Sequence, residues 1–141
     1  MNRIVFNKSL CVSCHSCEVG CSVIHSPEKS LISVMLEGVR PRIRIVYDDN
    51  KKTIVVEQCR HCKKAKCIEA CPEKALSYDE EGRVVCSEKC TGCGACEKAC
   101  PFYAIRVVES CIKCDLCKDV ADFPVCVTYC PVGALTVKEV H

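Results

Sequence analysis

The chain has 141 residues, the size of one ordinary domain, and 18 of them are cysteine. Aromatic residues make up 5% of the chain and tryptophan is absent, so little material remains for a large apolar core. The formal net charge of +2 is too close to zero for a nucleic-acid-binding surface, and we expect no nucleic-acid partner.

The start of the chain, residues 1–8, lacks the apolar region of a secretory signal, which is about 7–15 residues long. No later stretch approaches the roughly 18 consecutive apolar residues of a membrane helix, so we expect no membrane span. Without a signal, the cysteines are expected to serve as thiolate ligands in a reducing compartment rather than as disulfides. The predicted location is therefore cytoplasmic.

The cysteines fall into four groups along the chain, and Cys86 lies outside all of them. The first and third groups have the spacing C-x2-C-x2-C-x3-C, and the second has a longer middle gap. The last three groups end in Cys-Pro. In chain order the groups are Cys11, Cys14, Cys17 and Cys21; Cys59, Cys62, Cys67 and Cys71; Cys90, Cys93, Cys96 and Cys100; and Cys111, Cys114, Cys117, Cys126 and Cys130.

This spacing is typical of [4Fe-4S] ferredoxins. Two-residue gaps allow three thiolates of one tight loop to converge on a single cubane cluster, and the fourth cysteine ligates the neighbouring cluster. Four groups therefore predict two reciprocal pairs, four [4Fe-4S] clusters and sixteen thiolate ligands. Structural zinc favours paired C-x2-C units that close one tetrahedral site, and that pattern fits these groups poorly.

Between the first two groups, residues 39–57 carry no cysteine. Residues 42–45 alternate polar and apolar side chains, residues 48–50 form a turn signal, and residues 53–56 read as the return strand. The segment therefore predicts a β-hairpin. The sequence leaves open whether this hairpin covers a cluster or provides a docking surface for a partner.

The last three groups share the pattern C-P-x-x-A-[LI], which indicates an internal repeat. A hairpin is predicted from residues 75–78 and 83–85, and short strands are predicted over residues 106–108 and 136–137. Each unit reads as a ligand loop, a short helix and a strand, which is the ferredoxin unit. The predicted fold class is α+β, with two ferredoxin-like modules (a double bicluster ferredoxin), little regular structure and short hairpins.

Four segments carry a family resemblance: residues 17–25 (CEVGCSVIH), 41–45 (PRIRI), 58–62 (QCRHC) and 113–117 (KCDLC). With these segments, nearly the whole chain resembles the four-cluster electron-transfer subunits of the dimethyl-sulfoxide-reductase and hydrogenase type. Within that group it looks most like the iron–sulfur partner proteins of carbon monoxide dehydrogenases and tungsten aldehyde oxidoreductases.

The resemblance implies a ligand assignment. Spacing alone leaves open whether Cys111 or Cys126 is the spare thiol of the fourth group, whereas the family's fourth motif, K-C-D-x-C followed by C-x3-C-P, makes Cys111 spare. The family also pairs its first motif with its fourth and its second with its third. The implied ligand sets are Cys11, Cys14, Cys17 and Cys130 (cluster 1); Cys21, Cys114, Cys117 and Cys126 (cluster 2); Cys59, Cys62, Cys67 and Cys100 (cluster 3); and Cys71, Cys90, Cys93 and Cys96 (cluster 4).

The same pairing implies the domain organisation. Residues 1–38 and 110–141 would form the first bicluster module, residues 58–109 the second, and residues 39–57 the inserted hairpin, with the clusters in a near-linear order. The non-ligand cysteines, Cys86 and Cys111, are expected to be buried thiols that act as small apolar side chains.

Three histidines lie in or beside the motifs. His15 and His61 lie inside ligand loops but are not needed as ligands, because all the required cysteines are present. The resemblance implies that His25 hydrogen-bonds near a cluster.

The sequence contains no phosphate-binding loop, dinucleotide fingerprint or nucleophile motif, so we expect no catalytic residues in this chain. The resemblance implies a one-electron relay within an anaerobic oxidoreductase complex of the carbon monoxide dehydrogenase, aldehyde oxidoreductase, hydrogenase or formate dehydrogenase type. Its partners would be a catalytic subunit, a redox carrier, or both. The alternatives are a free soluble polyferredoxin that serves several enzymes and a scaffold whose clusters are mainly structural.

Overall fold

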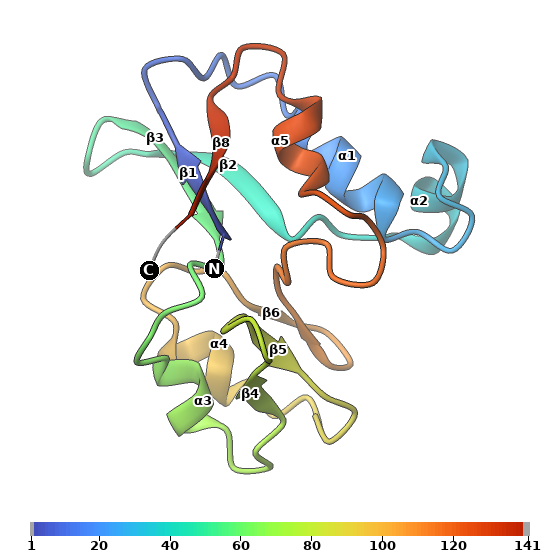
Figure 1. Cartoon of the computed structure of the whole chain (residues 1–141), viewed down its shortest axis with the longest axis vertical. Helices are drawn as coiled ribbons and strands as arrows, with labels where there is room; N and C mark the ends of the chain where they lie inside the picture. The colour runs from blue at the N-terminus through green and yellow to red at the C-terminus, as the bar shows by residue number, and fades with distance from the viewer. Residues whose placement is uncertain (1, 140–141) are drawn as a thin grey trace.

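The computed structural model describes residues 2–139, which lie in two halves (Figure 1). The upper half in this view contains β1 (Asn2–Phe6), α1 (Ser16–Ile24), α2 (Leu31–Glu37), β2 (Ile43–Asp48), β3 (Thr53–Gln58), α5 (Val125–Tyr129) and β8 (Leu135–Glu139). The lower half contains α3 (Lys66–Ala70), β4 (Leu76–Tyr78), β5 (Val84–Cys86), α4 (Ala95–Ala99), β6 (Arg106–Val107) and β7 (Cys111–Ile112).

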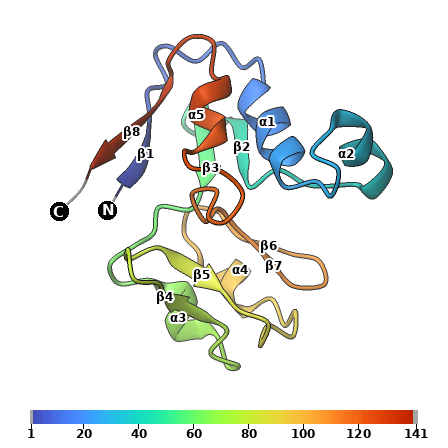
Figure 2. The same ribbon diagram turned by 45° about the vertical axis from the view of Figure 1, so that its right-hand side comes forward.

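The strands form antiparallel pairs. β2 pairs with β3 and β4 pairs with β5, so both predicted hairpins are confirmed. β6 pairs with β7, and β8 extends the strand predicted over residues 136–137. Its partner β1, which the sequence pattern did not predict, brings the two ends of the described chain side by side (Figure 2).

The helices also associate in pairs, α1 with α5 and α3 with α4. Gly20 allows the first pair to approach closely, because a Cβ atom at this position would lie 2.8 Å from the Tyr129 ring. Helices α3, α4 and α5 have five residues each, and helices this short are not stable alone, so they depend on packing. Each of these three is followed by a cysteine that precedes proline, and the residue before proline disfavours further helix. Within residues 2–139, no helix has the length and apolar character that crossing a bilayer requires.

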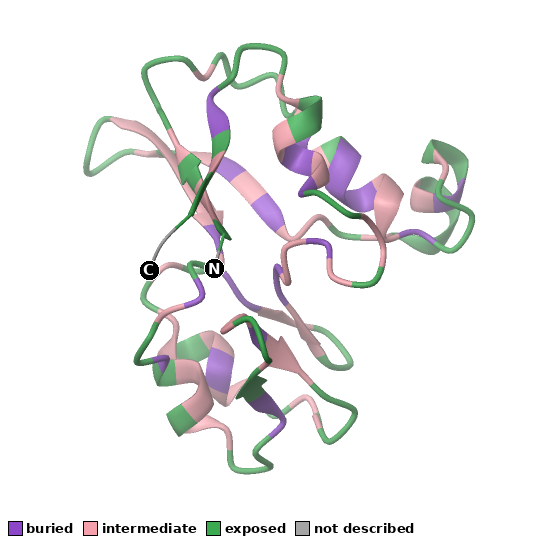
Figure 3. Ribbon diagram, in the orientation of Figure 1, coloured by how far each residue is buried: buried purple, intermediate pink, exposed green. Residues whose placement is uncertain are grey.

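Each half has a small core that combines thiols with apolar side chains. Buried residues accordingly lie in both halves (Figure 3). The first core joins the buried thiols of Cys17, Cys21 and Cys126 to apolar side chains of β2 and β8. The second core joins Leu76, Val84 and Ile105 to Cys96, and four further motif cysteines pack against its edge. The elements of each half therefore pack around a few aliphatic side chains together with motif cysteines.

Candidate metal centres

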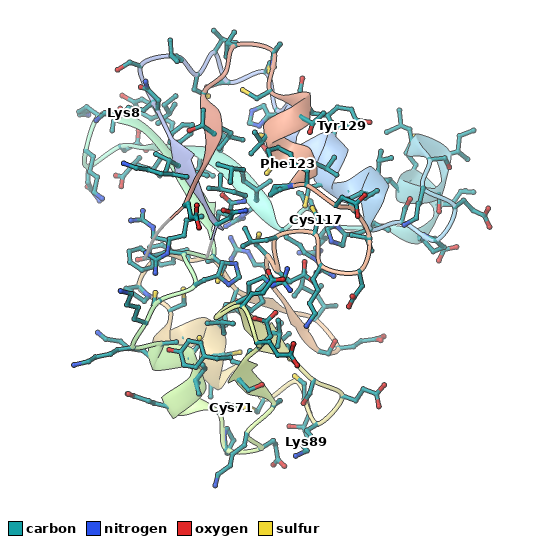
Figure 4. All side chains as sticks on the ribbon, viewed as in Figure 1. Lys8, Cys71, Lys89, Cys117, Phe123 and Tyr129 are labelled. Carbon is teal, nitrogen blue, oxygen red and sulfur yellow. The ribbon has the colours of Figure 1, made fainter. Side chains whose placement is uncertain are left out.

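Three cavities are lined by cysteines that come from motifs far apart in the sequence. We call the thiol sets sites 1, 2 and 4, after the predicted clusters. Site 1 gathers Cys11, Cys14, Cys17 and Cys130; site 2 gathers Cys21, Cys114, Cys117 and Cys126; and site 4 gathers Cys71, Cys90, Cys93 and Cys96, together with Cys86 and Cys111. Figure 4 labels Cys117 of site 2 in the upper half and Cys71 of site 4 in the lower half.

The remaining predicted set, which we call site 3, consists of Cys59, Cys62, Cys67 and Cys100. Cys62, Cys67 and Cys100 pack against the second core. Burial raises the pKa of Cys67 to about 11, and the charges of the nearby Cys59 and Cys100 thiolates act in the same direction with smaller effects. These thiols therefore lie together where α3 packs against α4.

One backbone conformation recurs in all four motifs. The second residue after the first cysteine has a positive φ in each case: 57° at Ser13, 47° at His61, 77° at Gly92 and 59° at Leu116. In three motifs this residue donates its N–H to the cysteine's Sγ atom at 3.4 Å, and Gly92 makes the same bond to Cys90. The repeat aligns Cys114, rather than Cys111, with the first cysteines of the other motifs.

A second repeated conformation explains the pattern C-P-x-x-A. The third residue after the last cysteine has a positive φ at Lys74, Tyr103 and Gly133. The alanine that follows then donates its N–H to the cysteine, at 3.3 Å from Ala75 to Cys71 and 3.2 Å from Ala134 to Cys130.

Backbone N–H groups elsewhere also point at motif thiols. Arg42 N–H donates to Cys21 Sγ at 3.2 Å, Cys111 N–H to Cys90 Sγ at 3.3 Å, and Val125 N–H to Cys117 Sγ at 3.5 Å. Hydrogen bonds to an ionised sulfur are charge-assisted, and in iron–sulfur sites they tune the reduction potential.

Burial favours the neutral thiol at several motif cysteines. Desolvation raises the pKa of Cys17 and of Cys21 to about 11 and that of Cys126 to about 12. A cysteine must lose its proton before it ligates a metal, so metal affinity at these sites depends on pH. Within residues 2–139, no three His, Cys, Asp or Glu side chains converge on a single-ion site, whereas the four thiols of site 1 and the four of site 2 each line a cavity. Such a donor set, with N–H groups turned towards sulfur, fits a [4Fe-4S] cluster.

Gln58 is a site residue that the sequence pattern did not reveal. Its buried side-chain amide donates to Cys114 Sγ at 3.7 Å and to Cys126 Sγ at 3.8 Å, both in site 2. Its backbone directly precedes Cys59 of site 3. Its place at the end of a predicted strand, directly before a motif cysteine, was the available signal.

Lys113 was also not predicted to have a role. Its side chain is buried, and Nζ donates to the carbonyl oxygen of Val84 and, at 2.7 Å, to that of Cys114. Arg42 donates to the Lys113 carbonyl at 3.3 Å and pairs with Asp115 at 3.3 Å. The fourth motif is thereby tied both to the lower half, at β5, and to the start of the β2–β3 hairpin.

The three histidines have different environments. His61 is buried and its Nδ1 accepts the Val84 N–H at 2.9 Å, while burial lowers the pKa of His61 to about 3, so its ring is neutral. His25 Nδ1 lies 2.8 Å from the Cys21 carbonyl and 3.8 Å from Cys21 Sγ, so its ring contacts a candidate ligand of site 2. His15 is exposed and pairs with Glu18.

The prediction that Cys86 and Cys111 are buried requires a correction, whereas their exclusion from the sixteen ligands stays a prediction. Cys86 and Cys111 are half-buried and line the site 4 cavity with its four motif thiols. β5 ends at Cys86 and β7 begins at Cys111, so both hairpins of the lower half deliver a thiol to this cavity. Cys86 lies outside the four cysteine groups, and the family resemblance makes Cys111 the spare thiol of the fourth; neither observation gave a sign of this convergence.

Two iron–sulfur families match this chain. A family described as a 4Fe-4S dicluster domain matches residues 50–140, and one described as a 4Fe-4S binding domain matches residues 8–24. The electron transport protein HydN of Escherichia coli (strain K12) is 36% identical over 96% of this chain and 87% of its own length. AegA of the same organism is 34% identical over 96% of this chain, which spans 22% of AegA.

Two solved structures are similar in fold. The active site complex BamBC of benzoyl coenzyme A reductase, as isolated, superposes with a TM-score of 0.54 at 26% identity, covering 98% of this chain and 76% of that one. The same complex with benzoyl-CoA gives a TM-score of 0.53 at 25% identity, covering 98% and 79%.

Proposed function

This chain belongs to the 4Fe-4S dicluster family of iron–sulfur electron-transfer proteins, and from that premise we propose that it relays single electrons through four [4Fe-4S] clusters as a subunit of an oxidoreductase complex. The observation that carries the proposal is the convergence of distant cysteine motifs on shared cavities. Sites 1 and 2 combine the first and fourth motifs, and site 4 combines the second and third. We assign the sixteen ligands to the four sites as described above, with Cys86 and Cys111 left over.

The repeated backbone conformation supports Cys114 as the first ligand of the fourth motif. Leu116 has the same positive φ and the same N–H bond to sulfur as Ser13 in the first motif. Cys111, in contrast, begins strand β7 and pairs with Val107.

Short connections between the sites support the order 1, 2, 3, 4 along the electron path. Cys17 of site 1 and Cys21 of site 2 lie one turn apart on α1. Gln58 hydrogen-bonds the site 2 thiols and is joined by one peptide bond to Cys59 of site 3. Helix α3 separates Cys67 of site 3 from Cys71 of site 4 by a single turn.

An exposed apolar helix supports the role of a bound subunit. The side chains of Leu31, Ile32, Met35 and Leu36 on α2 are between 56% and 79% exposed, whereas polar Ser33 is buried. A surface helix normally turns its apolar face inwards, and large exposed apolar patches mark interaction sites. We therefore place the contact with the catalytic partner at α2, which packs against α1 and so lies next to the helix that carries ligands of sites 1 and 2.

We extend the proposal to the class of partner: a catalytic subunit of the carbon monoxide dehydrogenase, aldehyde oxidoreductase, hydrogenase or formate dehydrogenase type, in the cytoplasm. The resemblance in residues 17–25 and 113–117 supports this class. The structural similarity to an active site complex supports a catalytic partner, and the eighteen free thiols support a reducing compartment.

The test is the native mass of the protein purified without oxygen from its own cells, with co-purifying chains identified and iron counted. We expect a stoichiometric larger chain, and sixteen iron atoms per copy of this chain, four for each of the four proposed clusters. A lone species near the 15.6 kDa of the polypeptide would show a diffusing polyferredoxin and contradict the subunit proposal.

The docking role of α2 is tested by the double variant Ile32→Glu/Met35→Glu. We expect loss of the co-purifying partner with unchanged iron content, because both side chains are exposed and neither lines a thiol site. Val108→Glu, which places one charge on an exposed apolar position of the other half, is the control and should keep the partner. Retention of the partner by the double variant would exclude α2 as the contact.

A further inference from the structure

Site 4 has more thiols than a [4Fe-4S] cluster uses. Six cysteines line its cavity, whereas four line each of the cavities of sites 1 and 2. A cubane cluster takes four protein thiolates. Two thiols of site 4 are therefore in surplus at the place where iron would be bound.

The surplus thiols flank one particular motif ligand, Cys90. The Cys111 backbone N–H donates to Cys90 Sγ at 3.3 Å, which holds residue 111 directly beside this sulfur. Cys86 and Cys111 line the same cavity as Cys90 and Cys96, two ligands of this site. Both surplus cysteines also pack against the second core, of which Cys96 is part.

The surrounding elements keep the surplus thiols in place. Cys86 lies opposite Leu76 in the β4–β5 hairpin, and Leu76 is part of the second core. Cys111 lies opposite Val107 in the β6–β7 hairpin. The ligand loop contacts the turn of that hairpin so closely that a Cβ atom on Gly92 would lie 2.6 Å from the Glu109 carbonyl oxygen.

We propose that Cys86 and Cys111 are reserve ligands, so that site 4 holds its cluster through alternative sets of four thiols. In the exchange an iron–sulfur bond to Cys90 breaks and one to Cys111 or Cys86 forms. The proton of the incoming thiol passes to the departing Cys90 thiolate, so no electron is gained or lost. Site 4 is then the cluster that survives the loss of one motif ligand.

This inference rests on the proposed four-cluster content, and the test separates the two. Full-length protein is assembled without oxygen as the wild type, as Cys90→Ala, and as Cys11→Ala, the matched change at the first cysteine of site 1. Iron and acid-labile sulfide are counted per chain, and the reduced clusters are examined by electron paramagnetic resonance. A wild-type count below sixteen iron atoms would contradict the proposed function, whereas each variant is judged against the wild-type count.

We expect Cys90→Ala to keep the wild-type iron count and Cys11→Ala to lose between one and four iron atoms. The triple variant Cys90→Ala/Cys86→Ala/Cys111→Ala should show a loss like that of Cys11→Ala. The double variant Cys86→Ala/Cys111→Ala should keep all its iron. Equal losses in Cys90→Ala and Cys11→Ala would overturn the proposal, and so would full retention of iron in the triple variant.

A second measurement uses the wild-type protein, in case Cys90→Ala does not fold. The cluster-loaded chain is treated with iodoacetamide under argon, and the labelled cysteines are identified by mass spectrometry. If the thiols exchange, Cys86 and Cys111 are labelled together with Cys90 at a lower level, while Cys11 and Cys114 stay unlabelled. Labelling confined to Cys86 and Cys111 would show a fixed ligand set and overturn the proposal.

Discussion

The first cysteine of each motif has the same local environment, although the residue two positions on differs. Ser13, His61 and Leu116 adopt the left-handed conformation despite the cost of roughly 1–2 kcal/mol for a residue with a Cβ atom. Their N–H groups consequently point at sulfur. In the third motif the same position is Gly92, where space as well as conformation restricts the residue.

Gly92→Ala is expected to destabilise the cluster-loaded protein by about 3 kcal/mol, because the new methyl group would contact a backbone carbonyl 2.6 Å away in addition to the left-handed strain. Gly94→Ala is the matched control. It has a similar φ of 81° with open space around it, so it should cost about 1 kcal/mol. Urea unfolding under argon measures both, and equal effects would contradict the role of the Glu109 contact.

Asp79 holds the turn of the β4–β5 hairpin and contacts the fourth motif. Burial disfavours its charge, but hydrogen bonds from Arg83, from the Glu81 N–H and from Lys118 prevail and lower the pKa of Asp79 to about 2, from 3.8. Because the folded pKa is depressed, this stabilisation is fully present above pH 3.8 and is lost as the pH falls through about 2.

Asp79→Asn is therefore expected to cost about 1 kcal/mol in urea unfolding, a value discounted for solvent screening at its partner Lys118, which is 33% exposed. The cost should be constant between pH 6 and 8, since that range lies above the titration window. Glu81→Gln removes a neighbouring carboxylate that is 68% exposed and should change stability by less than about 0.5 kcal/mol. A cost that varied between pH 6 and 8 would contradict the low pKa of Asp79.

At the scale of elements, two helix pairs carry candidate ligands, α1 with α5 and α3 with α4. The close contact of α1 with α5 at Gly20 can be tested by substitution. Gly20→Ala is expected to cost about 1 kcal/mol net, because contact with the Tyr129 ring outweighs the higher helix propensity of alanine. Val19→Ala changes an exposed neighbour on the same helix and serves as the control.

The coupling between the two helices is measured with a double-mutant cycle that adds Tyr129→Leu. A smaller side chain at this position should relieve part of the cost of Gly20→Ala. Independent effects of the two substitutions in urea unfolding would show that the helices do not meet at this point.

At the scale of the whole molecule, candidate ligands form part of both cores: three of the six buried residues of the first core and one of the five of the second. Removal of iron by a chelator should therefore unfold the chain. The buried apolar side chains are few, and the binding energy of metal to thiolates is lost together with the iron. Far-ultraviolet circular dichroism before and after chelation measures the loss of structure. A cooperatively folded, iron-free chain with the same secondary structure would contradict this expectation.

Lys113 connects the two halves and places a buried ammonium group beside the site 2 ligand Cys114. A nearby positive charge stabilises the reduced form of a cluster, and the effect is large where water is excluded. Lys113→Met should therefore lower the reduction potential of the site 2 cluster by about 59 mV or more, a tenfold shift for one electron.

Redox titration followed by electron paramagnetic resonance measures this potential. Lys51→Met removes the same charge from the exposed turn of the β2–β3 hairpin and should leave all potentials within experimental error. Equal shifts in the two variants would mean that the position of the charge does not matter.

The sequence by itself determined the iron–sulfur chemistry and the two main hairpins. Cysteine spacing is a local property, so it reports which thiols share a loop, and strand alternation with turn residues is local as well. Strand β1 and helix α2 were not predicted. β1 gains its partner from the far end of the chain, and α2 turns its polar side inwards, against the usual pattern.

Only the tertiary structure decided which residues outside the motifs surround each site. Gln58 contacts site 2 although it is adjacent in sequence to a site 3 cysteine. Cys86 and Cys111 reach the site 4 cavity from two different hairpins. These placements depend on how strands and loops pack across long separations in the chain, and the identity of a side chain carries no information about such distances.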